Sequence, residues 1–104
     1  MPTTQPVVPT TQPVTGPQPV YCGAGFNGLA IVAITTQGSA ACSTATSVTN
    51  EYAAHSADWG PGFSVAVTAD DGSVWTCQEQ LGDPNPYQEC VNQQNPAEKV
   101  RLSS

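Results

Sequence analysis

The spacing of apolar residues after residue 26 predicts several short strands that differ in how they are buried. Residues 27–36 are largely apolar on both faces and include β-branched Ile31, Val32 and Ile34, a pattern typical of a strand covered on two sides. Residues 63–69 alternate instead, which indicates a strand with one buried face. Further strands are predicted at residues 73–80, 87–91 and 99–103.

A helix is predicted over residues 40–55, between the first two of these strands. Its apolar residues recur at steps of four, three and four and therefore share one helical face. These residues are Ala41, Ala45, Val48 and Tyr52. The alanines allow the helix to lie close to a sheet. Ser39 is a suitable N-cap, because its hydroxyl can accept an amide hydrogen bond from the first turn.

The turn at residues 70–72 decides which faces of two neighbouring strands meet. A two-residue turn would leave Trp75 on the face opposite Val67. A three-residue loop with Gly72 in the left-handed conformation pairs Val67 with Trp75 instead. Because the buried face fixes the register of a strand, the three-residue loop is favoured. It collects one apolar face from Phe63, Val65, Val67, Trp75 and Cys77.

The order of elements, β-α-β-β-β-β, predicts an α+β fold over residues 21–104. We expect one helix packed on a four- to five-stranded antiparallel sheet. Residues 1–20 differ in kind, because the proline- and threonine-rich sequence of 2–7 recurs at 9–14. Such a segment predicts a disordered, extended linker. Two alternatives are an O-glycosylated stalk and a PxxP ligand at residues 6–9.

Four cysteines in so short a chain predict two disulfides and an oxidising compartment. We therefore expect a secreted, cell-surface or otherwise extracytoplasmic protein. Cys77 and Cys90 lie symmetrically about a turn at residues 83–84, which favours a Cys77–Cys90 bond across two strands and leaves Cys22 with Cys42. Alternatively, Cys42 staples the helix to the sheet through Cys77 or Cys90. The spacing lacks the close cysteine pairs of zinc sites, so neither a metal nor another cofactor is expected.

The charge of the chain excludes some classes of partner. The net charge is −6, and Lys99 and Arg101 are its two basic residues apart from His55. Such a chain cannot neutralise a phosphate backbone or adhere to an anionic membrane surface, so nucleic acid and membrane surfaces are not expected partners. The sequence has no apolar run of membrane-spanning length and no signal peptide. We therefore expect it to be part of a longer secreted or membrane-anchored precursor.

Catalytic and metal-binding residues have weak support in the sequence. His55 follows Glu51 by four residues, so a small secreted hydrolase could use His55 as a base oriented by Glu51, with a serine from elsewhere. Alternatively, His55 is a solvent-facing residue at a helix end. Asp70, Asp71 and Asp83 could ligate calcium, but a hairpin turn explains the first two better. No catalytic residue is assigned.

Four residues are candidates for binding a partner: Trp59, Asp83, Asn85 and Tyr87. Trp59 lies in a glycine- and proline-rich loop, where aromatic residues often bind proteins or sugars, although it could also fold over the edge of the core. The loop at residues 82–86 could form the contact surface of a secreted inhibitor or effector.

The order of landmarks at residues 39–45, 75–77, 89–91 and 100–102 resembles small C-terminal extracytoplasmic modules of actinobacterial membrane proteins and lipoproteins, some of them outside receptor-type kinases. In those modules a proline- and threonine-rich stalk leads to a cysteine at the start of a helix and then to two cysteine-bearing strands. Cys22 is not part of that pattern. The resemblance implies a location at the cell envelope. It also implies a non-enzymatic binding or sensing role, with a protein or cell-wall ligand.

Overall fold

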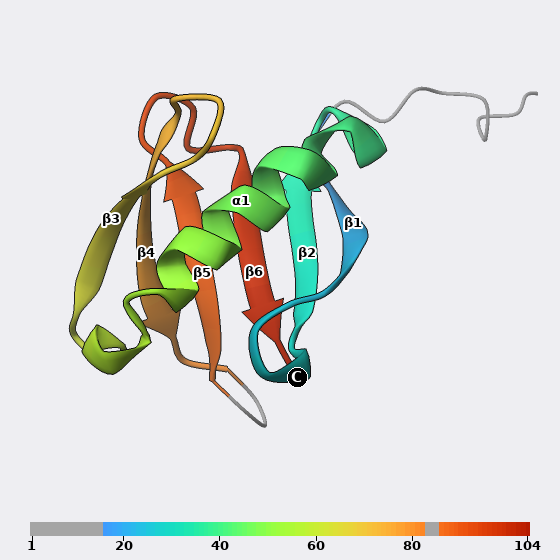
Figure 1. The fold of residues 1–104 in the computed structure, drawn as a ribbon. Coiled ribbons are helices and arrows are strands. Elements are labelled where there is room, and N and C mark those ends of the chain that lie inside the picture. Colours follow the sequence, from blue (N-terminus) through green and yellow to red (C-terminus); the bar gives the residue numbers. More distant parts are fainter. Residues whose placement is uncertain (1–15, 83–85) are drawn as a thin grey trace, which may run out of the picture.

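The computed structural model describes residues 16–82 and 86–104. Within these residues, one α-helix packs on one antiparallel sheet, which confirms the predicted α+β class (Figure 1). The sheet of the described residues has six strands rather than four to five, in the order β1-β2-β6-β5-β4-β3. The additional strand is β1, which precedes the first predicted strand.

Strand β1 (Gln18–Ala24) pairs with β2 (Ala30–Thr35) at one edge of the sheet. It begins three residues inside the segment predicted as linker, and residues 1–15 lie outside the described residues. Pro19 fits this strand because an edge strand does not need every amide for pairing. Strand β2 is shorter than predicted, because Phe26–Gly28 form a 3₁₀ turn before it.

Helix α1 carries the chain across one face of the sheet, from β2 to the far edge. From β2 it passes a 3₁₀ turn (Gly38–Ala41), helix α1 (Cys42–Ala53) and a second 3₁₀ turn (Ser56–Asp58), and reaches β3 (Ser64–Thr68) at the far edge. It returns through β4 (Val74–Gln80), β5 (Tyr87–Asn92) and β6 (Lys99–Ser103), each antiparallel to the one before. Strand β6 completes the sheet, because it also pairs with β2 and so lies between β5 and β2.

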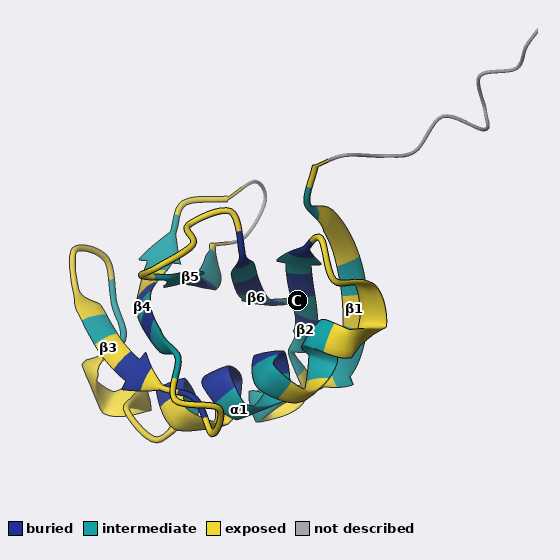
Figure 2. Ribbon diagram, turned by 90° about the horizontal axis from the view of Figure 1, so that it is seen from above, coloured by how far each residue is buried: buried dark blue, intermediate teal, exposed yellow. Residues whose placement is uncertain are grey.

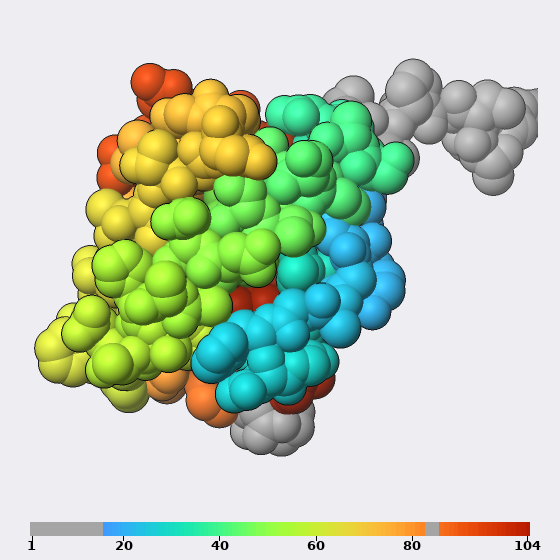
Figure 3. Space-filling model, in the orientation of Figure 1, coloured from blue at the N-terminus to red at the C-terminus, as the bar shows by residue number. Residues whose placement is uncertain are grey.

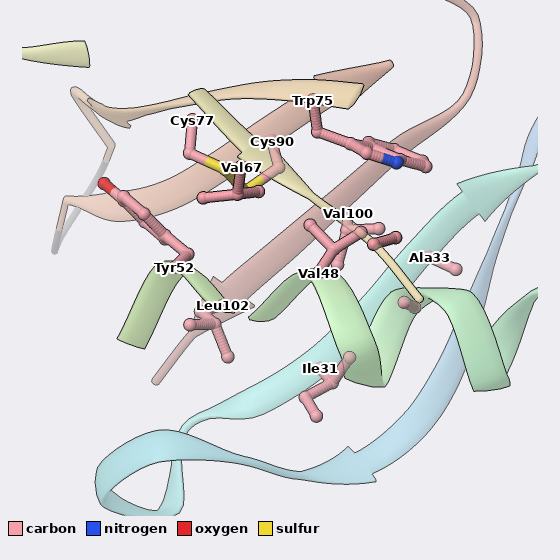
Figure 4. Close-up of a cluster of buried hydrophobic side chains, with 12 residues drawn as sticks. Ile31, Ala33, Val48, Tyr52, Val67, Trp75, Cys77, Cys90, Val100 and Leu102 are labelled. Carbon is pink, nitrogen blue, oxygen red and sulfur yellow. A yellow bond between two sulfur atoms is a disulfide. The ribbon is translucent and has the colours of Figure 1, made fainter. Parts of the chain in front are cut away.

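The sheet is strongly curved, and α1 lies against its concave face (Figure 2). In the space-filling view, α1 and the β1–β2 connection hide most of that face (Figure 3). The core lies between helix and sheet (Figure 4). Its buried apolar residues are Ile31, Ala33, Ala45, Val48, Tyr52, Val67, Ala69, Trp75, Cys77, Cys90, Val100 and Leu102.

The β3–β4 hairpin has the predicted register. Val67 pairs with Trp75, and Gly72 has a φ of 88°, which a side chain would strain. Phe63 is the exception, because its side chain is 64% exposed rather than buried. Strand β3 begins at Ser64, so the alternation of the strand does not extend to Phe63, which belongs to a turn closed by its amide on the Gly60 carbonyl.

The apolar face of α1 is also as predicted, with Ala45, Val48 and Tyr52 buried. The predicted cap is wrong. Ser39 lies inside the preceding 3₁₀ turn, and the residue at the N-cap of α1 is Ala41, which makes no side-chain hydrogen bond. The 3₁₀ turn supplies the entry to the helix that a capping side chain provides elsewhere.

Both predicted disulfides are present among the described residues, all four cysteines being described. Cys77 and Cys90 are directly opposite each other on β4 and β5, as the symmetry of their positions predicted. The second bond joins Cys22 of β1 to Cys42, the first residue of α1. The helix is therefore fixed to the edge of the sheet at its start, and the alternative pairings of Cys42 are excluded.

Candidate functional site

A pocket opens beside the start of α1. Its lining residues lie at the end of the sheet that carries the β2–α1, β3–β4 and β5–β6 connections, which Figure 1 shows together. Its volume is about 80 Å³. Its apolar lining consists of Ala33, Ala41, Ala45, Trp75 and Val100. Its polar lining consists of Thr35, Gln37, Thr44, Asp71, Ser73, Asn92, Glu98 and Lys99.

The space exists because small residues meet at this place. Ala33 comes from β2, and Ala41 and Ala45 come from the start of α1. A methyl side chain at each position leaves room between helix and sheet that a larger residue would fill. The buried side chains of Trp75 and Val100 close the space from β4 and β6.

A chain of hydrogen bonds runs along one wall, on the β3–β4 turn. The indole Nε1 of Trp75 donates to the Ser73 hydroxyl (2.8 Å), and that hydroxyl donates to Oδ1 of Asp71 (2.5 Å). The Ser73 amide also donates to Oδ1, at 2.9 Å, and Thr44 of α1 donates to Oδ2, at 3.3 Å. The Ser73 hydroxyl and then its amide hold the pKa of Asp71 below the usual value, so Asp71 is an anion at neutral pH.

Glu98 forms the other polar wall, directly before β6. Its side chain lies on the same face as Val100 and is only 6% exposed. Its Oε1 atom accepts a hydrogen bond from the Thr35 hydroxyl. Its Oε2 atom accepts hydrogen bonds from the amide and the hydroxyl of Thr36, at 3.1 and 3.2 Å. Glu98 therefore fixes the turn that leads from β2 toward α1.

Of the basic residues, Lys99 belongs to the lining of the pocket, whereas Arg101 and His55 lie elsewhere. Arg101 pairs with Glu89 at 2.8 Å, and His55 lies 3.9 Å from Asp58. Lys99 precedes the buried Val100, so the alternation of β6 directs its side chain to the convex face. Within residues 16–82 and 86–104, the ion pairs leave Glu98 without a cationic partner. The lining of the pocket thus holds two acidic residues and one basic residue, and it is partly apolar.

Trp59, one of the predicted binding residues, lies at the opposite end of α1. Its ring stacks on Tyr52 with centroids 4.5 Å apart and meets Phe26 edge to face at 5.2 Å. Its Nε1 atom donates to the carbonyl oxygen of Tyr52. These contacts correspond to the interpretation in which Trp59 folds over the edge of the core, and they place it away from the pocket.

The other predicted binding residues do not join Trp59. Tyr87 begins β5 on the convex face, where the Arg101 guanidinium lies 5.1 Å from its ring centroid. Asp83 and Asn85 lie outside the described residues. The described candidates are therefore spread over two faces of the domain.

His55 and Glu51, the hypothetical catalytic pair, are both exposed. The ionic partner that the structure gives His55 is Asp58, in the 3₁₀ turn after α1. His55 has therefore the surroundings of a solvent-facing residue at a helix end. The hydrolase remains a hypothesis from the sequence.

No group of three or more histidine, cysteine or acidic side chains that could hold a metal occurs in the described ranges. Asp70 and Asp71 instead form the β3–β4 turn, as predicted, where Asp70 donates its amide to the Ser47 hydroxyl at 2.9 Å. Of the helices described, none has the length and apolar character needed to cross a bilayer.

Sequence reasoning missed Glu98, Thr35 and Asn92 as pocket residues. One signal for Glu98 was present, because it continues the alternation of Val100 and Leu102 and so lies on the buried face of β6. A carboxylate on the buried face of a strand is rare and is a reason to search for a site. Nothing in the sequence indicated that Thr35, at the end of β2, and Asn92, at the end of β5, line the same pocket.

Comparisons with known proteins gave no relative: no family model matches the chain, and no match was found among curated proteins or among solved structures.

Proposed function

We propose that the chain is an extracytoplasmic binding or sensing domain, carried on a proline- and threonine-rich linker, that takes a small polar group of a protein or cell-wall ligand into the pocket beside α1. The observation that carries the proposal is the pocket itself, a space with apolar walls and several convergent polar groups. This combination is the usual character of a ligand site.

The position of the pocket supports this role. Its polar residues come from the ends of β2, β5 and β6, from the β3–β4 turn and from the β2–α1 connection and first turn of α1, whereas the elements behind them are held by two disulfides. Binding residues are commonly placed on connections above a rigid scaffold. The disulfides also agree with an oxidising, extracytoplasmic location. The resemblance to stalked envelope modules points to the same class of protein, and the role requires no catalytic step.

The test is co-sedimentation of the full chain with insoluble cell-wall polymer, together with capture by the detergent-extracted envelope proteins as a second arm. Ala41→Leu fills the pocket from its rim, so we expect it to lose binding in the arm that retains the wild type. Ala54→Leu is the matched control, because Ala54 is exposed at the other end of α1.

Two results would count against the proposal: a wild-type chain that binds in neither arm, or an Ala41→Leu variant that binds as tightly as Ala54→Leu. His55→Ala provides the contrast with the hydrolase hypothesis. We expect it to bind like the wild type, and an activity that disappears in this variant would favour the hydrolase instead.

A further inference from the structure

We propose that the pocket beside α1 recognises a primary ammonium group. This inference names the ligand chemistry of the proposed binding site and therefore rests on the proposed function. Three properties of the described residues carry it: the two carboxylates of the pocket, the hydrogen-bond acceptors that remain in it, and its size and lining.

Two carboxylates, Glu98 and Asp71, line the pocket with one basic residue, Lys99, and neither carboxylate is in an ion pair among the described residues. Glu98 is buried, and its described partners are neutral donors from Thr35 and Thr36. Asp71 on the opposite wall is held in its anionic form by Ser73. A carboxylate in a low-dielectric setting attracts a cation more strongly than one in water. The net charge of −6 extends this attraction to longer range.

Hydrogen-bond acceptors remain free on both walls. A carboxylate oxygen can accept two hydrogen bonds. Among the described contacts, Oε1 of Glu98 accepts only the one from Thr35, and Oδ2 of Asp71 accepts only the long one from Thr44. A primary ammonium has three N–H donors, which suit acceptors that converge from several directions. A quaternary ammonium has no N–H donor and cannot use them.

The size and lining suit a small polar head group. The volume of about 80 Å³ exceeds the roughly 10–15 Å³ that one water molecule needs on the same measure, so the pocket has room for such a group. Trp75 lines the pocket. It is the one aromatic side chain among the described residues that line the pocket, whereas quaternary ammonium sites use cages of several.

The first experiment is an amide NMR titration of the full chain with ethylammonium chloride. We expect saturable shifts at Gly72, Ser73, Glu98 and Lys99, which lie on or beside the two walls. Sodium chloride controls for ionic strength, ethanol for the uncharged analogue, and tetramethylammonium for charge without donors. The proposal is overturned if any of these three compounds reproduces the shifts at equal concentration.

The second experiment tests the two carboxylates. Because Glu98 is a buried charged acceptor, Glu98→Gln should weaken ethylammonium binding by about tenfold; Asp71 is exposed and screened by solvent, so Asp71→Asn should weaken it by about two- to fivefold. Asp58→Asn, an exposed carboxylate outside the pocket, is the matched control and should bind as the wild type does. Amide spectra establish that each variant is folded. Since Asp71 is exposed, its variant keeps the test valid if Glu98→Gln unfolds. Wild-type affinity in folded Asp71→Asn overturns the proposal.

The third experiment separates two sources of the group. Nα-acetyl-lysine amide presents the ammonium of a peptide side chain, and glucosamine presents that of an amino sugar. Saturable binding of either one supports the proposal and identifies the source. Failure of both contradicts it. We expect the lysine derivative to bind more tightly, because its ammonium stands on a slender chain.

Failure of this inference can be told from failure of the proposed function. If an envelope fraction retains the wild type but not Ala41→Leu, and Glu98→Gln is still retained, the pocket binds a ligand of other chemistry. If neither fraction retains the wild type and the ethylammonium shifts persist, the ammonium site stands and the envelope role does not.

Discussion

The two ends of α1 face the same curved sheet but differ in what lies between helix and strands. At the first end, alanines leave an open pocket lined with carboxylates and hydroxyls. At the second end, Tyr52 fills the space, Trp59 stacks on Tyr52, and Phe26 packs against Trp59. Side-chain size along a single helical face therefore determines which end is available for a ligand and which end holds the fold together.

The two ends also use their polar groups differently. The Tyr52 hydroxyl donates to the side-chain oxygen of Gln88 at 2.6 Å, and the Gln88 amide donates to Glu79 at 3.2 Å. These bonds join helix α1 to strands β5 and β4. At the pocket end, the carboxylates of Asp71 and Glu98 keep unused acceptor positions. The polar groups of the filled end thus join α1 to the sheet, whereas those of the open end join the connections around the pocket.

The largest effect on stability is expected when the buried ring of Tyr52 is removed from the filled end of α1. Tyr52→Ala should lower the free energy of unfolding by about 4 kcal/mol, because the removal of a buried ring leaves a cavity. The control is Tyr21→Ala, whose ring is 68% exposed on β1 and whose loss should cost less than about 1 kcal/mol. Urea denaturation measures both values. Equal losses in the two variants would contradict the assignment of Tyr52 to the core.

Removing the buried carboxylate of Glu98 tests how much this side chain contributes to the stability of the fold. Glu98→Ala leaves the Thr35 hydroxyl and the Thr36 amide without their acceptor, so the free energy of unfolding should fall by about 2 kcal/mol. Glu98→Gln keeps the size of the side chain and one acceptor oxygen, so the loss should be about half as large. The same denaturation measurement applies. An alanine variant as stable as the wild type would show that Glu98 serves only ligand binding.

A smaller effect concerns the hydroxyl of Tyr52. Tyr52→Phe should cost about 1 kcal/mol at neutral pH through the lost bond to Gln88. Burial and then the charge of Glu79 raise the pKa of Tyr52 to about 12, above the usual 10. The unfolded chain therefore loses this proton first, and the contribution that is complete below pH 10 disappears as the pH rises toward 12.

The pH dependence gives that prediction its measurement. Unfolding free energies between pH 8 and pH 12 should fall more steeply for the wild type than for Tyr52→Phe, because the variant lacks the titrating group. The two curves should run parallel below pH 10. Parallel curves over the whole range would mean that the surroundings of Tyr52 do not resist its ionisation.

The smallest expected effect is at the open end. Ala41→Leu places its added carbons in the pocket, so its free energy of unfolding should differ from that of the wild type by less than about 1 kcal/mol. Overpacking of a filled core typically costs about 1–3 kcal/mol, and a loss in that range would show that the pocket has no room. An Ala41→Leu variant that keeps its stability but loses ligand binding would therefore separate binding at the pocket from the stability of the fold.

The parts of the fold that could be predicted are those in which two local constraints agree. The β3–β4 register followed from the turn at Gly72 and from the need to bury Trp75. The Cys77–Cys90 bond followed from the symmetry of the next hairpin. Strand β1 was missed because prolines argue against strands in general, whereas an edge position tolerates Pro19.

The candidate site was beyond prediction for another reason. It is assembled from segments that meet only in the fold: Thr35 ends β2, Asp71 lies in a turn, and Glu98 precedes β6. Patterns in a single sequence indicate how neighbouring residues along the chain are arranged, but not which distant segments come together in the fold. Trp59 shows the converse, because a glycine- and proline-rich loop suggests exposure, whereas the stacking on Tyr52 depends on where α1 ends.

The Cys22–Cys42 bond has a mechanical consequence. Force applied before β1 and directed away from β2 would separate the β1–β2 pairs that precede Cys22, beginning with Gln18 and Thr35. At Cys22 the separation stops, because the load passes through a covalent bond to the first residue of α1. That residue follows Ala41 on the rim of the pocket. Such force would therefore be delivered beside the pocket and not at the end of α1 where Trp59 stacks on Tyr52.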